Sequence, residues 1–220
     1  MSTPSSFDQF DRDGALAETS ADALEALDSR GAFLRKVGIG AGALVGATAF
    51  AGVVPRVASG ATPKSDVAIL NYALTLEYLE AAFYTEAVAK GRFKGDLGKF
   101  ARIVKGHEVA HVKFLEGALG SAAVKKPTFD FKGTTTSRAQ FKATAQVLED
   151  TGVAAYLGQV GNIKSKQILA AAGSILPIEA RHAGWIRNIN GVSGAPRAFE
   201  GARTKAQILA AVAGTGFIVG

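Results

Sequence analysis

The chain has 220 residues, of which 48% are hydrophobic and 20% charged, as in ordinary packed globular proteins. It contains no cysteine, which excludes disulfides, thiolate metal sites, iron–sulfur clusters and cysteine nucleophiles. Only three histidines are present, His107, His111 and His182. Any metal site must therefore depend mainly on carboxylates.

The first 61 residues differ in composition from the rest. Residues 1–28 are rich in Ser, Thr, Ala and Asp and carry seven acids and one base, so we expect an acidic disordered segment. Residues 29–61 combine a basic flank, a charge-free apolar run over 37–54 and small residues up to Ala61, which is the pattern of an export signal.

The stretch from Ser29 to Arg35 resembles a twin-arginine export signal, except that Gly31 stands where the second arginine is expected. A retained membrane anchor and a buried helix of the folded domain are the alternatives, because 18 apolar residues are nearly enough to cross a bilayer. We predict an exported, periplasmic, extracytoplasmic or envelope-associated protein. Residues 62–220 carry 20 bases and 12 acids, a charge suited to an anionic envelope surface. No nucleic-acid motif accompanies it.

Helical periodicity dominates the domain predicted over 62–220. Apolar residues recur at steps of three and four, and glycines or capping residues mark the ends of each segment. Ser137 with Gln140, and Thr204 with Gln207, are candidate capping pairs, and Pro177 is expected to kink the fourth helix. The predicted helices cover 66–90, 97–119, 137 to at least 156, 165–190 and about 205–213.

The connections predict how the helices are arranged. Short links join the first helix to the second and the third to the fourth, so each pair is expected to be antiparallel. Residues 121–136 separate the pairs. Sixteen extended residues span about 50 Å, more than the roughly 35 Å of a 23-residue helix. The sequence therefore predicts an all-α, ferritin-like four-helix bundle with one long crossover and a short C-terminal helix.

Charged residues interrupt the apolar stripe of every long helix. A buried charge without a partner costs several kcal/mol, and spacing of three places a Glu and a His on one helix face. Four carboxylates and two imidazoles converging in a bundle core are the ligand set of di-iron and di-manganese proteins. A satisfied polar core network is the alternative. The candidate metal ligands are Glu77, Glu108, His111, Glu149, Glu179 and His182.

Three stretches carry a resemblance that covers about residues 64–215: 70–84 (LNYALTLEYLEAAFY), 148–156 (LEDTGVAAY) and 178–185 (IEARHAGW). They resemble the ferritin-like di-iron carboxylate superfamily, and most closely its bacterial members related to desiccation-related proteins. The first stretch is also similar to the first bacterioferritin helix, with Glu77 and Tyr84 at matching positions. The resemblance implies that the six candidates are ligands and that Glu108 and Glu179 bridge two metals.

Several neighbours have two interpretations. Glu80 either supplements or replaces Glu77 as a ligand, or lies beside the ligands. His107 is expected at the surface or next to a ligand rather than on a metal. Tyr84 and Tyr156 either pack in the core or hydrogen-bond a ligand carboxylate.

Carboxylate and imidazole donors suit two iron ions, with manganese or a mixed pair as alternatives. Metal ions and oxygen or peroxide are the expected partners, and a homo-oligomer is compatible with the sequence. The predicted function is metal binding and oxidation, or ferroxidase- or peroxidase-like chemistry, in stress protection. The alternative is an envelope stress or desiccation protein with a mainly structural bundle. The sequence identifies no catalytic residue and no organic cofactor.

Overall fold

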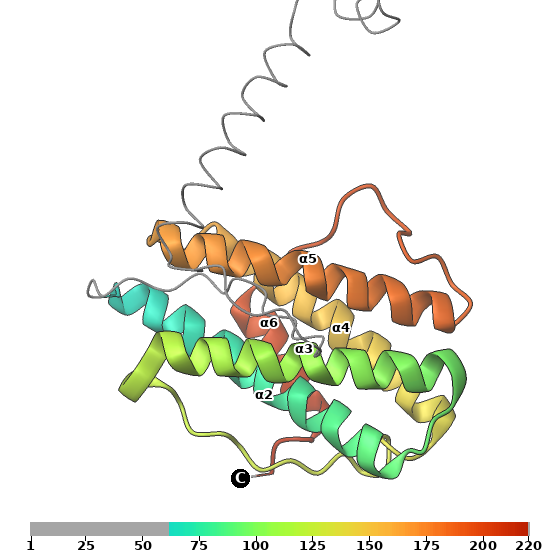
Figure 1. Cartoon of the computed structure of the whole chain (residues 1–220). Helices are drawn as coiled ribbons and strands as arrows, with labels where there is room; N and C mark the ends of the chain where they lie inside the picture. The colour runs from blue at the N-terminus through green and yellow to red at the C-terminus, as the bar shows by residue number, and fades with distance from the viewer. Residues whose placement is uncertain (1–61, 220) are drawn as a thin grey trace, which may run out of the picture. The chain divides into compact units, whose positions relative to one another are not determined.

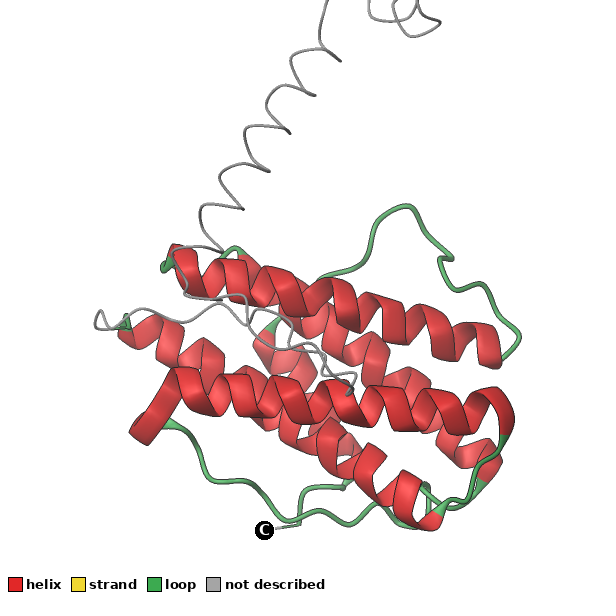
Figure 2. Cartoon of the chain, in the orientation of Figure 1, coloured by secondary structure: helices red, strands yellow, loops and turns green. Residues whose placement is uncertain are grey.

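A computed structural model of the chain describes residues 62–219. The predictions for the acidic segment 1–28 and the export signal 29–61 lie outside this part. The described residues form helices and loops, without a named strand (Figure 2). The elements are α2 (Lys64–Lys90), α3 (Gly95–Leu119), the 3-10 turn η1 (Gly120–Ala122), α4 (Arg138–Val160), α5 (Lys166–Ile189) and α6 (Lys205–Thr215).

The four long helices form a bundle of two antiparallel pairs. Helix α2 packs most extensively against α3, and α4 against α5. Residues 123–137 connect the pairs and run the length of the bundle before α4 begins (Figure 1). The predicted all-α bundle with a long crossover and a short C-terminal helix is therefore confirmed.

Side-chain caps start the last three helices. Ser137 accepts a hydrogen bond from the backbone N–H of Gln140, and Ser165 accepts one from that of Ile168. Thr204 and Gln207 form a reciprocal capping box at α6. These caps satisfy backbone donors that have no partner inside the helix. The caps at Ser137 and Thr204 were predicted from the sequence, and the one at Ser165 lies where the fourth helix was predicted to begin.

Pro177 lies inside α5, which continues through it from Lys166 to Ile189. A proline removes the N–H that would bond to the carbonyl four residues earlier, here that of Gly173. Both Gly173 and Pro177 are on the exposed face of the helix. Water can therefore satisfy the freed carbonyl, and the proline does not end the helix.

Helix α2 is buried on more than one side. Besides the face toward the bundle, Leu76, Leu79 and Phe83 are buried in a cluster that includes Phe131 of the crossover and Ile208 of α6. The segment after α6 pairs with the crossover, because Asp130 N–H donates to Phe217 O and Val219 N–H donates to Thr128 O. The crossover, α6 and the last described residues thus form a cover over α2.

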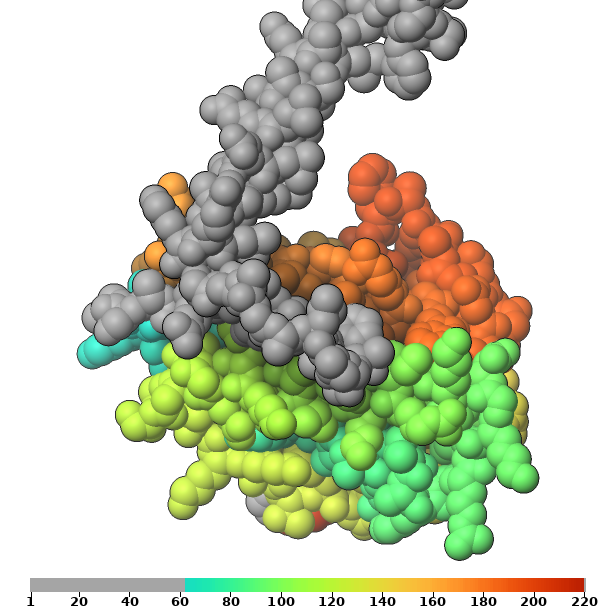
Figure 3. All heavy atoms as spheres, in the orientation of Figure 1, coloured from blue at the N-terminus to red at the C-terminus, as the bar shows by residue number. Residues whose placement is uncertain are grey.

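The segment between α5 and α6, residues 190–204, rises above the upper edge of the bundle in the view of Figure 3. Phe199 on this loop is 88% exposed. None of the helices in residues 62–219 is both long and apolar enough to cross a membrane.

Candidate metal centre

The bundle brings all six predicted ligands together in its core. Glu77 lies on α2, Glu108 and His111 on α3, Glu149 on α4, and Glu179 and His182 on α5. Glu108, Glu149 and Glu179 are wholly buried, and His111 is the most exposed of the six, with 12% of its side chain accessible. Each long helix therefore contributes at least one carboxylate to a single buried site.

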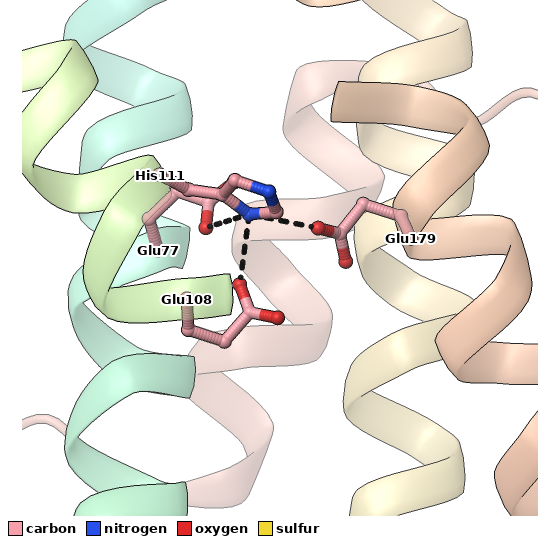
Figure 4. A group of neighbouring side chains, drawn as sticks. All are labelled: Glu77, Glu108, His111 and Glu179. Carbon is pink, nitrogen blue, oxygen red and sulfur yellow. Dashed lines mark hydrogen bonds and ion pairs between the residues drawn. The ribbon is translucent and has the colours of Figure 1, made fainter. Parts of the chain in front are cut away.

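The first group of donors surrounds Nδ1 of His111. This nitrogen lies 3.3 Å from Glu77 Oε2, 3.2 Å from Glu108 Oε2 and 3.2 Å from Glu179 Oε1. Figure 4 shows the three carboxylates directed toward the imidazole from α2, α3 and α5. Their donor atoms all lie within 4.8 Å of one another, a spacing that lets one metal ion reach all four.

The second group surrounds Nδ1 of His182. This nitrogen lies 3.1 Å from Glu108 Oε1, 3.2 Å from Glu149 Oε2 and 3.9 Å from Glu179 Oε2. Glu108 and Glu179 thus belong to both groups and present one oxygen to each. Carboxylates shared in this way can bridge two ions, as the resemblance implied.

Several buried donor atoms in the cluster have no hydrogen-bond partner. They are Glu108 Oε1, Glu149 Oε2, both carboxylate oxygens of Glu179, and Nδ1 of His182. Nδ1 of His182 lies 3.1–3.2 Å from the oxygens of Glu108 and Glu149, but without the geometry of a hydrogen bond. Burying so many polar atoms without hydrogen bonds is costly, unless a ligand satisfies them. The orphaned atoms all face the cluster, and the mixed oxygen–nitrogen donor set suits iron or manganese. The residues present therefore fit a pair of such ions, although metal binding itself stays a prediction.

Two buried tyrosines hold the outer oxygens of the terminal carboxylates. The hydroxyl of Tyr84 donates to Glu149 Oε1, and that of Tyr156 donates to Glu77 Oε1 over 2.5 Å. The sequence left open whether these tyrosines pack in the core or hydrogen-bond a ligand carboxylate. In the structure both hydrogen-bond a candidate ligand. Each bond leaves the other carboxylate oxygen free to face the cluster.

Glu80 is a fifth buried carboxylate next to the four of the cluster, one helical turn after Glu77 on α2. The carboxylate of Glu80 lies in the space that the absent side chain of Gly152 on α4 leaves open. A Cβ at this glycine would lie 3.3 Å from Glu80 Oε1 and 3.2 Å from Glu179 Oε2. Glu80 therefore lies beside the cluster, although it belongs to neither group of donors that share a common point.

His107 lies against one of the candidate ligands. Its Nδ1 is 2.8 Å from Nε2 of His182, and the two ring planes are nearly parallel, with centroids 5.1 Å apart. The sequence predicted His107 either at the surface or next to a ligand, and the structure places it next to the candidate ligand His182. The signal in the sequence was weak because His107 precedes Glu108 and lies only at the edge of the inner stripe.

The electrostatics of the cluster follow from crowding negative charge in a buried space. Burial raises the pKa of Glu179 well above its ordinary value, and the negative charge of Glu108 is the next largest cause. Burial raises the pKa of Glu77 to about 7, although His111 opposes it. Burial alone would lower the pKa of His182, but its contacts with Glu108 and Glu149 outweigh it and raise the pKa to about 10. Without metal, protons therefore balance part of the negative charge.

These features define a four-helix bundle with a buried cluster of carboxylates and histidines that could hold metal. A family model described as a ferritin-like domain matches residues 65–192. The chain therefore belongs to the ferritin-like domain family, and the predicted superfamily is confirmed. No curated protein matches the chain in sequence. The closer link to desiccation-related proteins stays a prediction.

Proposed function

We propose that this protein binds two iron or manganese ions between its four long helices and uses them in redox chemistry with oxygen or peroxide. One observation carries the proposal. The two groups of donors share Glu108 and Glu179, and both lie in the core of the bundle. The shared carboxylates would hold both ions, and His111 and His182 would each bind one of them through Nδ1.

Such a pair supplies one-electron steps between the divalent and trivalent states. The residues of the chain contribute the surroundings. Tyr84 and Tyr156 orient the terminal carboxylates, and the burial of the donors excludes bulk water. A metal-oxidising or peroxide-consuming activity in stress protection is the form of this chemistry that we propose.

Metal analysis of the purified full-length protein tests the proposal. We expect close to two ions per chain after loading with Fe²⁺ or Mn²⁺, and a loss of both in Glu108→Ala, because Glu108 belongs to both groups. The matched control is Glu116→Ala, an exposed residue on the same helix. A metal-free protein whose stability is unchanged by added ions would instead support the alternative of a mainly structural bundle.

Oxidation of Fe²⁺ in the presence of dioxygen or peroxide, followed optically, tests the redox part. The parent should accelerate the reaction and Glu108→Ala should not. Binding of two ions without acceleration would leave a metal-binding protein and contradict the enzymatic role.

Export is a separate proposal, supported by the basic flank and the charge-free run in residues 29–61. Fractionation with an antibody to residues 62–220 should find the protein in the periplasm, outside the cytoplasm or in the envelope. Full-length protein soluble in the cytoplasm would contradict it. A charged residue in the run, such as Val45→Arg, should block export, whereas Val45→Leu should not.

A further inference from the structure

The two halves of the metal cluster differ in what supports their histidines. Nδ1 of His182 faces the carboxylates, and its Nε2 meets Nδ1 of His107 at 2.8 Å. Nδ1 of His111 faces carboxylates in the same way. Within residues 62–219, however, no side chain forms a comparable hydrogen bond with Nε2 of His111.

A neutral imidazole carries its single proton on one of its two nitrogens. For Nδ1 to donate a lone pair to a metal, the proton must be on Nε2. A hydrogen-bond acceptor at Nε2 fixes that tautomer and the orientation of the ring. Nδ1 of His107 is such an acceptor when the proton of His107 is on its own Nε2.

The contact is well placed for this task. The rings of His107 and His182 are inclined by only 17°, so His107 also limits rotation of the His182 ring. His107 is half-buried and lies on α3, while His182 lies on α5. The groups that face Nδ1 of His182 are the carboxylates of Glu108, Glu149 and Glu179. The group that faces Nε2 of His182 is Nδ1 of His107.

We infer that His107 is a positioning residue that holds His182 in the tautomer able to bind metal, and that it acts on one of the two ion positions only. The inference rests on the proposed function. It gives the two positions unequal affinities, because the His182 position has a supported histidine and the His111 position does not.

Titration of the full-length protein with Co²⁺, followed by calorimetry and visible absorption, tests this asymmetry. The parent should bind two ions. His107→Ala should weaken one step by about tenfold to hundredfold, the usual effect of losing such a partner, and leave the other step unchanged. His107→Asn should restore the weakened step, because its side-chain oxygen can lie where Nδ1 of His107 lies.

A second measurement reads the tautomer directly. With Zn²⁺ bound, long-range nitrogen–proton NMR correlations of the histidines should show His182 protonated at Nε2, with that proton protected from exchange. In His107→Ala the proton should exchange rapidly, while the signals of His111 stay the same.

The outcomes separate the two proposals. A parent that binds no Co²⁺ overturns the proposed function and this inference with it. If the parent binds two ions, three results would overturn this inference alone. They are equal binding by His107→Ala, failure of His107→Asn to restore the weakened step, and protonation of His182 at Nδ1.

Discussion

The hydroxyl of Tyr156 orients a carboxylate without facing the centre of the cluster itself. It donates to Glu77 Oε1, while Oε2 of Glu77 faces His111. Removing it leaves a buried oxygen unpaired and the carboxylate free to rotate. Tyr156→Phe should therefore weaken metal binding by about tenfold or more, measured by Co²⁺ titration.

Tyr78→Phe is the matched control for this variant. Tyr78 also lies on a core helix and donates to a carboxylate, but that carboxylate is Glu116, and the distance is 2.6 Å. Its removal should leave metal affinity unchanged. Equal effects of the two substitutions would show that Tyr156 acts on general stability and not through Glu77.

Gly152 leaves space for two carboxylates, those of Glu80 and Glu179. In Gly152→Ala the new methyl group would press on both at 3.2–3.3 Å. These side chains can move by a few tenths of an ångström, so the fold should persist while the donor geometry changes. We expect reduced metal affinity together with an unaltered helical circular dichroism spectrum.

Gly106→Ala serves as the comparison. Gly106 lies in α3, and the space that an added Cβ would occupy there is open. Ala favours a helix over Gly by about 0.5–1 kcal/mol. This variant should melt at a slightly higher temperature and bind metal as the parent does. Unchanged metal affinity in Gly152→Ala would mean that Glu179 tolerates the shift.

At the scale of elements, Asp66 joins the start of α2 to the start of α5. Its buried carboxylate accepts backbone hydrogen bonds from Lys164 and Ser165, the latter at 2.8 Å. Burial raises the pKa of Asp66, but the bonds from Ser165 and Lys164 outweigh it, so the pKa lies below its ordinary value of 3.8. The ionised form is therefore the one that stabilises the fold.

Asp66→Ala should lower the free energy of unfolding at neutral pH by about 1–3 kcal/mol, as for other lost hydrogen bonds to charged groups. A lowered pKa stabilises above the ordinary value, and this contribution is lost as pH falls through the folded-state pKa. Urea melts should thus show a gap between parent and variant at pH 7 that narrows as pH falls below the ordinary pKa of 3.8. Asp96→Ala, at the exposed first turn of α3, should show no such gap.

The segment that leads into α6 is fixed to α4 by close backbone contact. Arg203 N–H donates to Ala154 O, and a Cβ at Gly158 would lie 2.0 Å from the carbonyl oxygen of Arg203. The atoms in the way belong to the backbone of Arg203, which cannot move aside as easily as the end of a flexible side chain. Gly158→Ala should therefore displace this segment, at a cost of about 1–3 kcal/mol, and make Arg203 accessible to trypsin in limited proteolysis. Digestion at the parent's rate would show that α4 absorbs the methyl group.

At the scale of the whole molecule, metal and protons compete for one core. A raised pKa means that the folded protein keeps a proton that the unfolded chain has lost. The metal-free fold therefore loses stability as pH rises from 4.5 to about 7 through Glu77, and from 6.5 to about 10 through His182,. Metal binding must release these protons, so it strengthens over the same range.

The melting shift caused by metal should accordingly grow from pH 5 to pH 8. Ligand at one hundred times its Kd stabilises by about 2.7 kcal/mol, or about 5–10 °C for a chain of this size. Scanning calorimetry with and without Mn²⁺ measures it. His182→Ala should remove most of the shift at pH 8, and a shift that is the same at both pH values, or in both proteins, would contradict the site.

The sequence by itself determined the helices and the candidate ligands. Period-3.6 stripes and capping pairs are local features, so the stripes located the long helices and the pairs located the starts at Ser137 and Thr204. A charged residue on an apolar stripe is also local, because burial is costly for any unpaired charge. The length of residues 121–136 was enough to predict the crossover.

Only the tertiary structure decided what lies across helix boundaries. The contact of His107 with His182 joins α3 to α5 over 75 positions in sequence, and no periodicity encodes it. The cover over α2 was also missed, because Leu76, Leu79 and Phe83 form a second stripe whose partners come from the crossover and α6. Which oxygen of each glutamate faces which histidine depends on the packing of four helices at once, since only that packing sets the distances between side chains far apart in the chain.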